Sequence, residues 1–415
     1  MVLPSINILG SSGKYVEEKV NSKIERNKFS IFCPIPSRST LGKSLCSFCH
    51  RAYNSFSLRI TCGNPRGGGK ISIHMKDLIK IDYQDIISVK NLYDAWQEFL
   101  PGKKNKKDVS EFALNLAHNI FELHSDLKNK IYIHSKYIAF SINDPKPRNI
   151  HKASVRDRLL HHAIYRILYP YFDWLFIYDS YSCRNFKGTH KALDRFRDFG
   201  RKVSKNDTKT CWVLKGDIKK CFASIDHKIL KNILSGYVFD ADVLKLLDQI
   251  IDSFNTKDKT GVGLPLGNLT SQLLVNVYMN KFDQFIKHRM KIKHYIRYAD
   301  DFVILDTDKD YLWELVPKIA DFLEEELKLT LHPDKLFVKT LSSEVDFLGW
   351  VHFANYRVLR TATKKKMFRN IETKIEDKKE NTITSYLGML RWGNGWKLQR
   401  QIQKNSGKEV FPLLR

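Results

Sequence analysis

Residues 294–307 read "HYIRYADDFVILDT", and two adjacent aspartates, Asp300 and Asp301, interrupt a run that is otherwise apolar and strand-like. A buried charge is costly unless another group pairs with it. The flanking segments 294–299 and 302–305 both have the composition of strands, so we expect a β-hairpin with the two aspartates at or beside its tip. Aspartate also suits ordinary turns, and other parts of the chain must decide between the two interpretations.

A third carboxylate favours a functional interpretation. Asp217 ends the apolar run 210–218, "TCWVLKGDI", just before a segment that turns away from the strand. If these strands are neighbours, Asp217 converges with Asp300 and Asp301, and like charges at such distances repel unless cations lie between them. Two Mg²⁺ ions about 3.5–4 Å apart can bind the attacking and leaving oxygens of a displacement at phosphorus. The three aspartates therefore predict a metal-dependent nucleotidyl-transfer site.

The overall charge points to a polyanionic partner. The 415 residues include 70 Lys and Arg against 45 Asp and Glu, a formal net charge of +25. Such an excess favours nucleic acid, although a protein that is merely basic stays an alternative. A hydrophobic content of 43% is ample for a packed core, which argues against wholesale disorder. We find no run of about 18 apolar residues and no secretory leader, so we expect a cytoplasmic protein without a membrane partner.

The seven cysteines do not form an obvious disulfide framework, because their number is odd. The sequence "CSFCH" brings Cys46 and Cys49 next to His50, and zinc binding is one interpretation of it. A second CxxC or a spaced histidine pair is missing, so unpaired thiols in a loose segment are the preferred interpretation.

The texture of the sequence changes near residue 75. Residues 1–74 are unpatterned and rich in Ser, Gly and Arg, which predicts an N-terminal extension that is disordered or translated from a misplaced start. The rest is mixed α and β, with amphipathic helices expected at 154–172 and 311–329. Further strand-like runs include 345–353, and basic clusters fall at 102–107, 145–152 and 360–369.

Several motifs together resemble those of bacterial reverse transcriptases, over residues 82–400. They follow the order of that family: "DPKPRNIHKASVRDRLLHHAI" (144–164), "DSYSCRNFKGTHKAL" (179–193), "KGDIKKCFASIDH" (215–227), "GVGLPLGNLTSQLLVNVYMNKFD" (261–283), "YIRYADD" (295–301), "LTLHPDK" (329–335) and "FLGW" (347–350). A lone YADD would be weak, whereas this ordered set is specific. The resemblance implies an α+β fold of the right-hand polymerase type, with fingers at 75–209, a palm with an antiparallel sheet at 210–358 and a small helical thumb at 359–415.

The resemblance also implies roles for individual residues. The metal ligands would be Asp217, Asp300 and Asp301, with the backbone carbonyl of Ile218, and they would hold two Mg²⁺ ions for which Mn²⁺ can substitute. The nucleotide-binding residues would be Lys146, Arg148, Arg184, Phe222, Leu266, Gly267 and Gln272. Among them, Phe222 matches the steric gate that selects dNTPs over rNTPs, and the basic residues would clamp the triphosphate.

Further residues are assigned in the same way. Lys335 is a candidate general acid for the leaving pyrophosphate, with His332 as an alternative. The primer grip would be Phe347, Leu348 and Gly349, and Lys364, Lys365 and Lys366 would face the template–primer duplex. Trp392 and Trp396 are interpreted as core aromatics rather than base-stacking residues.

The fourth motif departs from the commoner wording of the family. In "LPLGNLTSQ", Leu266 stands where glutamine is usual and Gln272 where proline is usual. This form resembles the reverse transcriptases of diversity-generating retroelements and related defence-associated enzymes, and it implies low fidelity, particularly opposite template adenine. Drift without any effect on fidelity is the alternative.

The expected partners are an RNA template, a DNA or RNA primer and dNTPs, with a small accessory protein and a structured non-coding RNA as further candidates. The leading hypothesis is an RNA-directed DNA polymerase of the diversity-generating type, followed by an antiviral, defence-associated reverse transcriptase. An RNA-binding, maturase-like cofactor and an RNA-making polymerase of the same architecture are competing hypotheses. Since little sequence follows the thumb, we expect no nuclease or RNase H module.

Overall fold

The computed structural model describes residues 81–143, 147–257, 259–373 and 376–406, and four short strands nearer the N-terminus. The chain divides into two compact units, residues 1–85 and 86–415. The predicted boundary at 74/75 lies within the first unit, 11 residues before its end at Asp85.

The first unit contains two pairs of antiparallel strands. β1 (Ile8–Leu9) pairs with β2 (Tyr15–Val16), and β3 (Lys28–Ile31) pairs with β4 (Ile71–His74). These strands fall within the predicted extension. The candidate zinc ligands Cys46 and Cys49 lie outside the described residues.

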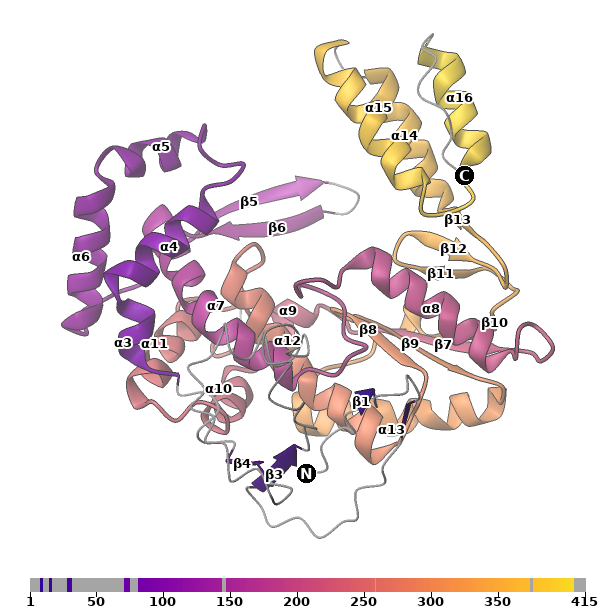
Figure 1. Ribbon diagram of the computed structural model, residues 1–415, viewed down its shortest axis with the longest axis horizontal. Coiled ribbons are helices and arrows are strands. Elements are labelled where there is room, and N and C mark those ends of the chain that lie inside the picture. Colours follow the sequence, from indigo (N-terminus) through magenta and orange to yellow (C-terminus); the bar gives the residue numbers. More distant parts are fainter. Residues whose placement is uncertain are drawn as a thin grey trace, which may run out of the picture. The chain divides into compact units, whose positions relative to one another are not determined.

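The second unit begins with a group of helices and one β-hairpin (Figure 1). The elements are α3 (Tyr83–Ile87, which spans the unit boundary), α4 (Val89–Phe99), α5 (Lys107–Leu114), α6 (Leu116–Lys128), β5 (Ile138–Asn143), β6 (Pro147–Lys152) and α7 (Val155–Leu175). Helix α7 confirms the helix expected at 154–172, and its start is capped by Ser154, whose hydroxyl accepts from the amide of Asp157. Helices α4 and α7 pack together, and Asn91 Nδ2 donates across their interface to the carbonyl of Ala163 at 3.1 Å.

The centre of the second unit is a four-stranded antiparallel sheet. Its order is β10 (Phe337–Thr340), β7 (Trp212–Asp217), β9 (Asp301–Asp306) and β8 (Tyr295–Tyr298). Strands β8 and β9 form the expected hairpin, and β7 is the neighbour of β9 that the position of Asp217 required. Gly216 lies opposite Phe302, and a Cβ on it would come within 2.3 Å of the Phe302 ring, so glycine is needed there.

Helices cover both faces of this sheet (Figure 1). On one face, Val213, Ile296 and Val303 share a buried cluster with Phe196 and Phe199 of α8 (Thr189–Val203). On the other face, Phe302 meets Phe282 of α12 (Leu269–Gln284), with ring centroids 5.3 Å apart, and α13 (Lys309–Leu327) packs on β7, β9 and β10.

Alternation of side chains along the strands produces this arrangement, because successive residues point to opposite faces. Helix α13 confirms the second predicted amphipathic helix. The remaining elements of this region are α9 (Cys221–Ser224), α10 (His227–Ser235), α11 (Ala241–Asp252), the π-helical turn η2 (Phe285–Arg289) and the 3-10 turn η3 (Pro333–Lys335).

The run 345–353 is not one strand, as its composition suggested, but two. β11 (Val345–Phe347) and β12 (Trp350–His352) are joined by Leu348 and Gly349, and β13 (Arg357–Leu359) completes a three-stranded sheet. Both turn residues have positive φ, 51° and 84°, as a two-residue type I′ hairpin requires. The turn was not predicted from the sequence, because Leu348 occupies its first position and positive φ is uncommon for leucine.

The C-terminal helices are α14 (Thr361–Thr373), α15 (Glu376–Leu390) and α16 (Trp396–Ser406). Buried residues of these helices belong to the same hydrophobic cluster as α8, the central sheet and β11–β12. Helix α8 therefore packs with the sheet, although the predicted border at 209/210 assigns it to the fingers. No helix in the described ranges is both long enough and apolar enough to cross a membrane.

Candidate active site

Three aspartates from two adjacent strands meet at one end of the central sheet. Asp217 is the last residue of β7, Asp301 is the first residue of β9, and the two are direct partners in the strand register. Asp300 lies in the two-residue turn between β8 and β9, and its carbonyl accepts from the amide of Ile218 at 3.1 Å. The structure thus brings Asp217, Ile218, Asp300 and Asp301 together as predicted.

The electrostatics of this group are unfavourable without a counter-charge. Burial raises the pKa of Asp300, and the nearby Asp217 carboxylate raises it further. Burial raises the pKa of Asp301 to about 6; Lys215 opposes this shift, whereas Asp300 and Asp217 add to it. These shifts mean that the negative charge of the group is under-compensated in the fold.

Two lysines partly compensate the aspartates. Lys335 Nζ donates to Asp217 Oδ1 at 2.6 Å, and Lys215 Nζ lies 3.7 Å from Asp301 Oδ1. Lys215 is buried and also donates to the carbonyl of Asp346 at 3.0 Å, so it is held in place, whereas Lys335 is over one-third exposed. Lys335 is therefore in direct contact with a predicted metal ligand, and its role as a general acid stays a prediction.

The donor set fits Mg²⁺. Carboxylate and carbonyl oxygens are its preferred protein ligands, and a divalent cation would offset both the burial and the repulsion that raise the pKa of Asp300 and Asp301. Within the described residues, no three His, Cys, Asp or Glu side chains are grouped closely enough to hold an ion by themselves.

The turn that carries Asp300 is held from behind by Arg297. Ala299, the residue before Asp300, has a positive φ of 55°, which is strained for a residue with a Cβ. Arg297 Nη1 donates to the carbonyl of Ala299 at 3.0 Å and to Asn276 Oδ1 of α12 at 3.2 Å. This contact ties the strained turn to a helix in the core.

Arg297 is fully buried and fully paired. Its Nε and Nη2 donate to the two carboxylate oxygens of Asp283 at 2.8 and 2.7 Å, and Nη2 also donates to Ser180 Oγ at 3.1 Å. Burial alone would lower the pKa of Arg297, but Asp283 raises it above the usual value, so the charge is retained. Sequence reasoning missed this residue, although an arginine between apolar neighbours in a central strand was a usable signal.

Phe222 lies in α9, five residues after Asp217, and is half-buried. Its carbonyl accepts from the amide of Leu264 at 2.7 Å, which joins α9 to the loop that precedes α12. The structure thus brings Phe222 close to the segment of Leu266 and Gly267. Its role as a steric gate stays a prediction.

The loop before α12 also contacts the β5–β6 hairpin. The amide of His151 donates to the carbonyl of Leu266 at 3.0 Å. Gly267 has a φ of 110°, and a Cβ there would come within 3.0 Å of Ile150. Gln272 is half-buried in the first turn of α12. A larger residue at 267 would push the hairpin away from this loop.

Of the residues predicted to clamp the triphosphate, Arg148 is best placed. It is exposed on β6, and its positive charge lowers the pKa of Asp300, so it lies within electrostatic reach of the aspartates. Lys146 lies outside the described residues.

The structure does not support Arg184 as a phosphate ligand. Its guanidinium donates to Asp173 Oδ1 at 2.6 Å and to the backbone carbonyls of Asp173, Ile177 and Ser180 at 3.1, 2.7 and 3.0 Å. The side chain is only 5% exposed. Because Nε, Nη1 and Nη2 all bond to the protein's own oxygens, Arg184 is a structural residue in this conformation.

The predicted primer grip is the β11–β12 turn. Phe347 is fully buried in the hydrophobic cluster that joins α8, the central sheet and the C-terminal helices, and Leu348 packs against that cluster. A Cβ on Gly349 would have no atom within 4 Å. In α14, Lys364 and Lys365 are exposed, whereas Lys366 is half-buried. Contact with primer or template by these residues stays a prediction.

Parts of this chain are similar to known proteins. Residues 142–352 match the family described as reverse transcriptase (RNA-dependent DNA polymerase). Protein YkfC of Escherichia coli (strain K12) is 25% identical over 303 residues, which cover 63% of this chain and 74% of YkfC. Group II intron-encoded protein LtrA of Lactococcus lactis subsp. cremoris is 24% identical over 292 residues, 54% of this chain and 47% of LtrA, so the match spans about half of LtrA.

Among solved structures, apo telomerase from Candida tropicalis, truncated from its C-terminal domain, is similar with a TM-score of 0.41 and 13% identity. That match covers 59% of this chain and 60% of the telomerase chain.

Proposed function

The chain belongs to the reverse transcriptase family of RNA-directed DNA polymerases, and on this premise we propose that it copies RNA into DNA at the Asp217, Asp300 and Asp301 site. The observation that carries the proposal is the register of β7 and β9, which brings carboxylates 84 residues apart in the sequence to one end of the sheet. The raised pKa values of Asp300 and Asp301 support a site that is completed by cations.

The site would hold two Mg²⁺ ions, or Mn²⁺ in their place, through these carboxylates and the Ile218 carbonyl. When bound, such ions lower the pKa of a primer 3′-hydroxyl and neutralise charge on the leaving pyrophosphate.

The chain's own residues do the rest. Arg148, and Lys146 beside it in the sequence, bind and orient the triphosphate. Lys335 Nζ, which contacts Asp217 Oδ1, would donate a proton to the pyrophosphate oxygen. Phe222 excludes a ribose 2′-hydroxyl, and Lys364 and Lys365 contact the phosphates of the template–primer duplex.

A primer-extension assay tests this proposal. The full chain is incubated with a primed RNA template, dNTPs and Mg²⁺ or Mn²⁺, beside the Asp300→Asn and Asp301→Asn variants. Extension that requires the intact aspartates supports the proposal. In a second experiment, the protein is expressed with its flanking locus and the co-purified nucleic acid is sequenced. If RNA binds but no DNA is made in either experiment, with either metal, the RNA-binding cofactor is favoured.

Sugar selection has its own test. Replacing Phe222 with Ala should raise the use of rNTPs relative to dNTPs by about 10- to 200-fold, since the exclusion of one hydroxyl by shape is worth about 1–3 kcal/mol. Equal rNTP use by the wild type and the variant would contradict the gate. Efficient rNTP use by the wild type would favour an RNA-making polymerase.

For the biological role, we propose a diversity-generating type of retroelement with error-prone copying. Support comes from Leu266, which has no side-chain amide to read the nascent pair, and from Gln272 in the first turn of α12. Sequencing of cDNA should show mismatches concentrated at template adenines, and the double variant Leu266→Gln, Gln272→Pro should reduce them. Uniformly low error rates in both proteins would point to a defence-associated enzyme instead.

A second role is favoured by the relatives. LtrA is by name encoded in a group II intron, which makes an intron-type, maturase-like role the specific competitor. An RNA that co-purifies, belongs to a flanking intron and is spliced only when this protein is present would establish that role. A structured non-coding RNA or a small accessory protein that co-purifies with cDNA would support the retroelement.

A further inference from the structure

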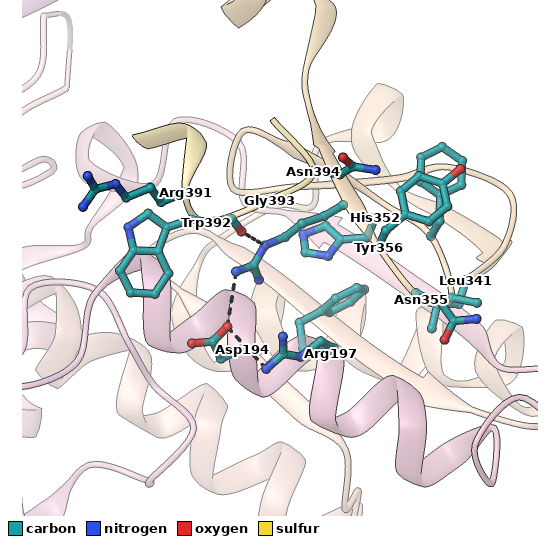
Figure 2. Close-up of a pocket in the computed structure, with 14 residues that line it drawn as sticks. Asp194, Arg197, Leu341, His352, Asn355, Tyr356, Arg391, Trp392, Gly393 and Asn394 are labelled. Atoms are coloured by element: carbon teal, nitrogen blue, oxygen red, sulfur yellow. Dashed lines mark hydrogen bonds and ion pairs between the residues drawn. The ribbon is translucent and has the colours of Figure 1, made fainter. Parts of the chain in front are cut away.

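A pocket of about 430 Å³ lies between α8, the β12–β13 hairpin and the loop that joins α15 to α16, and we call it the junction pocket (Figure 2). Its walls come from four separate parts of the chain: α8 with Asp194 and Arg197, Leu341 after β10, the segment 352–357, and the loop 391–394. None of the residues assigned above to metal, nucleotide, primer or template lines it. It is therefore a separate feature of the second unit.

The pocket is positively charged. Its lining has three guanidinium groups, Arg197, Arg357 and Arg391, against the single carboxylate of Asp194. Arg357 Nη2 donates to Asp194 Oδ1 at 3.2 Å, while Arg197 lies 3.8 Å from the same oxygen and is 47% exposed. Figure 2 shows Asp194 next to Arg197, with Arg391 on the far side of Trp392. The uncompensated charge suits an anionic group.

Aromatic side chains flank the charge on two sides. Trp392 stacks on His190 with ring centroids 3.8 Å apart and an angle of 17° between the planes, and it is 39% exposed. Tyr356 stacks on Phe353 at 4.6 Å and 18°, and it is also exposed. The interpretation of Trp392 and Trp396 as core aromatics is thus wrong, because both indoles are accessible. Exposed rings beside basic residues are typical of surfaces that bind unpaired nucleotides.

The rear of the pocket contains unsatisfied polar atoms. His352 Nε2 and Arg357 Nη1 are buried and have no hydrogen-bond partner within the described part of the chain. Burial, with the nearby Arg357 charge, lowers the pKa of His352 to about 3, so the ring is neutral. Buried polar atoms are usually satisfied, so two partnerless atoms in residues that line one pocket are unusual.

The loop is built to stay against the hairpin. A Cβ on Gly393 would come within 2.1 Å of the Trp350 ring, and the amide of Asn394 donates to the carbonyl of Arg357 at 2.8 Å. The backbone carbonyl of Trp392 accepts from Arg357 Nε. Trp392 and Arg357 are thereby held on one side of the same pocket.

We propose that the junction pocket binds an unpaired nucleotide of RNA, with its base stacked on Trp392 and its phosphate bound by Arg197 and Arg391. RNA is favoured over DNA because the amides of Asn355 and Asn394 and the hydroxyl of Tyr356 line the pocket and can bond to a 2′-hydroxyl. This site goes beyond the proposed polymerase function and does not rest on it.

The test measures RNA binding in the absence of metal and dNTPs. The full chain is first saturated with an unlabelled, blunt RNA–DNA hybrid that occupies the polymerase cleft. A labelled single-stranded RNA of about ten nucleotides, within the site sizes known for such surfaces, is then titrated by fluorescence anisotropy. Trp392→Ala should weaken binding by about 5- to 100-fold, since one base stack is lost.

Trp396→Ala is the matched control. Trp396 is a similarly exposed indole five residues from Arg391, but it does not line the pocket. The guanidinium carbon of Arg400 lies over its ring, 3.8 Å from the centroid. Its removal should leave RNA affinity unchanged. Trp392→Phe keeps a stacking ring and should bind within a few-fold of the wild type, which guards against misfolding of the alanine variant.

Arg391→Gln provides an independent measurement. Loss of one phosphate contact should reduce the slope of log affinity against log salt concentration by about 1. Equal affinities for Trp392→Ala and Trp396→Ala, with an unchanged salt slope, would overturn the site. Equal affinity for a DNA oligonucleotide of the same sequence would overturn the assignment to RNA. Failure of polymerase activity would appear only in the primer-extension assay.

Discussion

Two groups of charged residues meet at the β8–β9 hairpin, and their charges are compensated to very different extents. Behind the turn, Arg297 and Asp283 are fully buried and bond to each other through two hydrogen bonds. In front of it, Asp217, Asp300 and Asp301 repel one another and are only partly compensated by Lys215 and Lys335. The two groups therefore have different roles. The satisfied Arg297–Asp283 pair holds the backbone of the turn, and the unsatisfied aspartates are available to a ligand.

The largest expected effect is on activity at the unsatisfied cluster. Asp300→Asn should reduce polymerisation by about 10⁴-fold or more, as expected when one ligand of a catalytic unit is removed. The same change removes one of several repelling charges, so thermal stability should be unchanged or higher. Primer extension and a thermal melt of the same preparation measure both. A variant that is inactive because it is unfolded would contradict the comparison.

The opposite pattern is expected behind the turn. Arg297→Gln leaves Asp283 as an uncompensated buried charge and should lower the free energy of unfolding by about 3–5 kcal/mol. Urea denaturation measures this, with Asp283→Asn and the double variant closing a mutant cycle.

A separate variant, Arg297→Lys, distinguishes a positioning role of Arg297 from a purely stabilising one. If Arg297 positions the Asp300 turn, Arg297→Lys should lower kcat while KM for dNTP stays near the wild-type value, even at temperatures where it is fully folded. A kcat that follows the folded fraction alone would mean that Arg297 only stabilises the core.

A smaller effect on activity is expected at Lys335, which bonds to Asp217 of the unsatisfied cluster. Lys335→Gln should reduce the maximal rate by about 100-fold if the ammonium protonates pyrophosphate, within the range of general acid catalysis. Lys335→Arg is the control that keeps the charge. A full rate for Lys335→Gln, reached at a lower Mg²⁺ concentration, would instead make Lys335 a counter-ion that competes with the metal for Asp217.

The smallest effect is expected on the pH dependence of stability, and it involves the buried His161 of α7. Its Nδ1 bonds to Thr270 Oγ1 of α12 at 2.7 Å, and burial lowers its pKa from 6.5 to about 3, helped by the nearby His134. The unfolded state therefore binds one more proton than the folded state between about pH 6.5 and 3. The contribution of His161 to the free energy of unfolding should be fully present above about pH 6.5 and should fall as the pH drops towards 3.

The measurement is the slope of unfolding free energy against pH, taken between about pH 5 and 6, in the wild type and in His161→Asn. The variant should show a slope smaller by about one proton. Identical slopes would mean that His161 is already protonated in the fold or that other groups dominate the linkage.

Local features of this protein were predictable. The helices α7 and α13 and the strands around Asp217 and Asp301 follow from the periodicity of apolar residues. The Leu348–Gly349 turn was missed because leucine rarely adopts positive φ, and local composition alone favours a continuous strand. Arg184 was assigned to substrate by residue type, whereas its neighbours in space use up its donors.

The sequence by itself determined the hairpin, the three aspartates, the excess of basic residues and the order of the motifs, since these depend on residue type and short spacing. Only the tertiary structure decided which charges are paired. Lys335 bonds to Asp217 across 118 residues, and Arg357 bonds to Asp194 across 163. Contacts of that separation depend on how sheets and helices pack, and no local pattern records them. The same packing exposes Trp392 beside three arginines and creates the junction pocket.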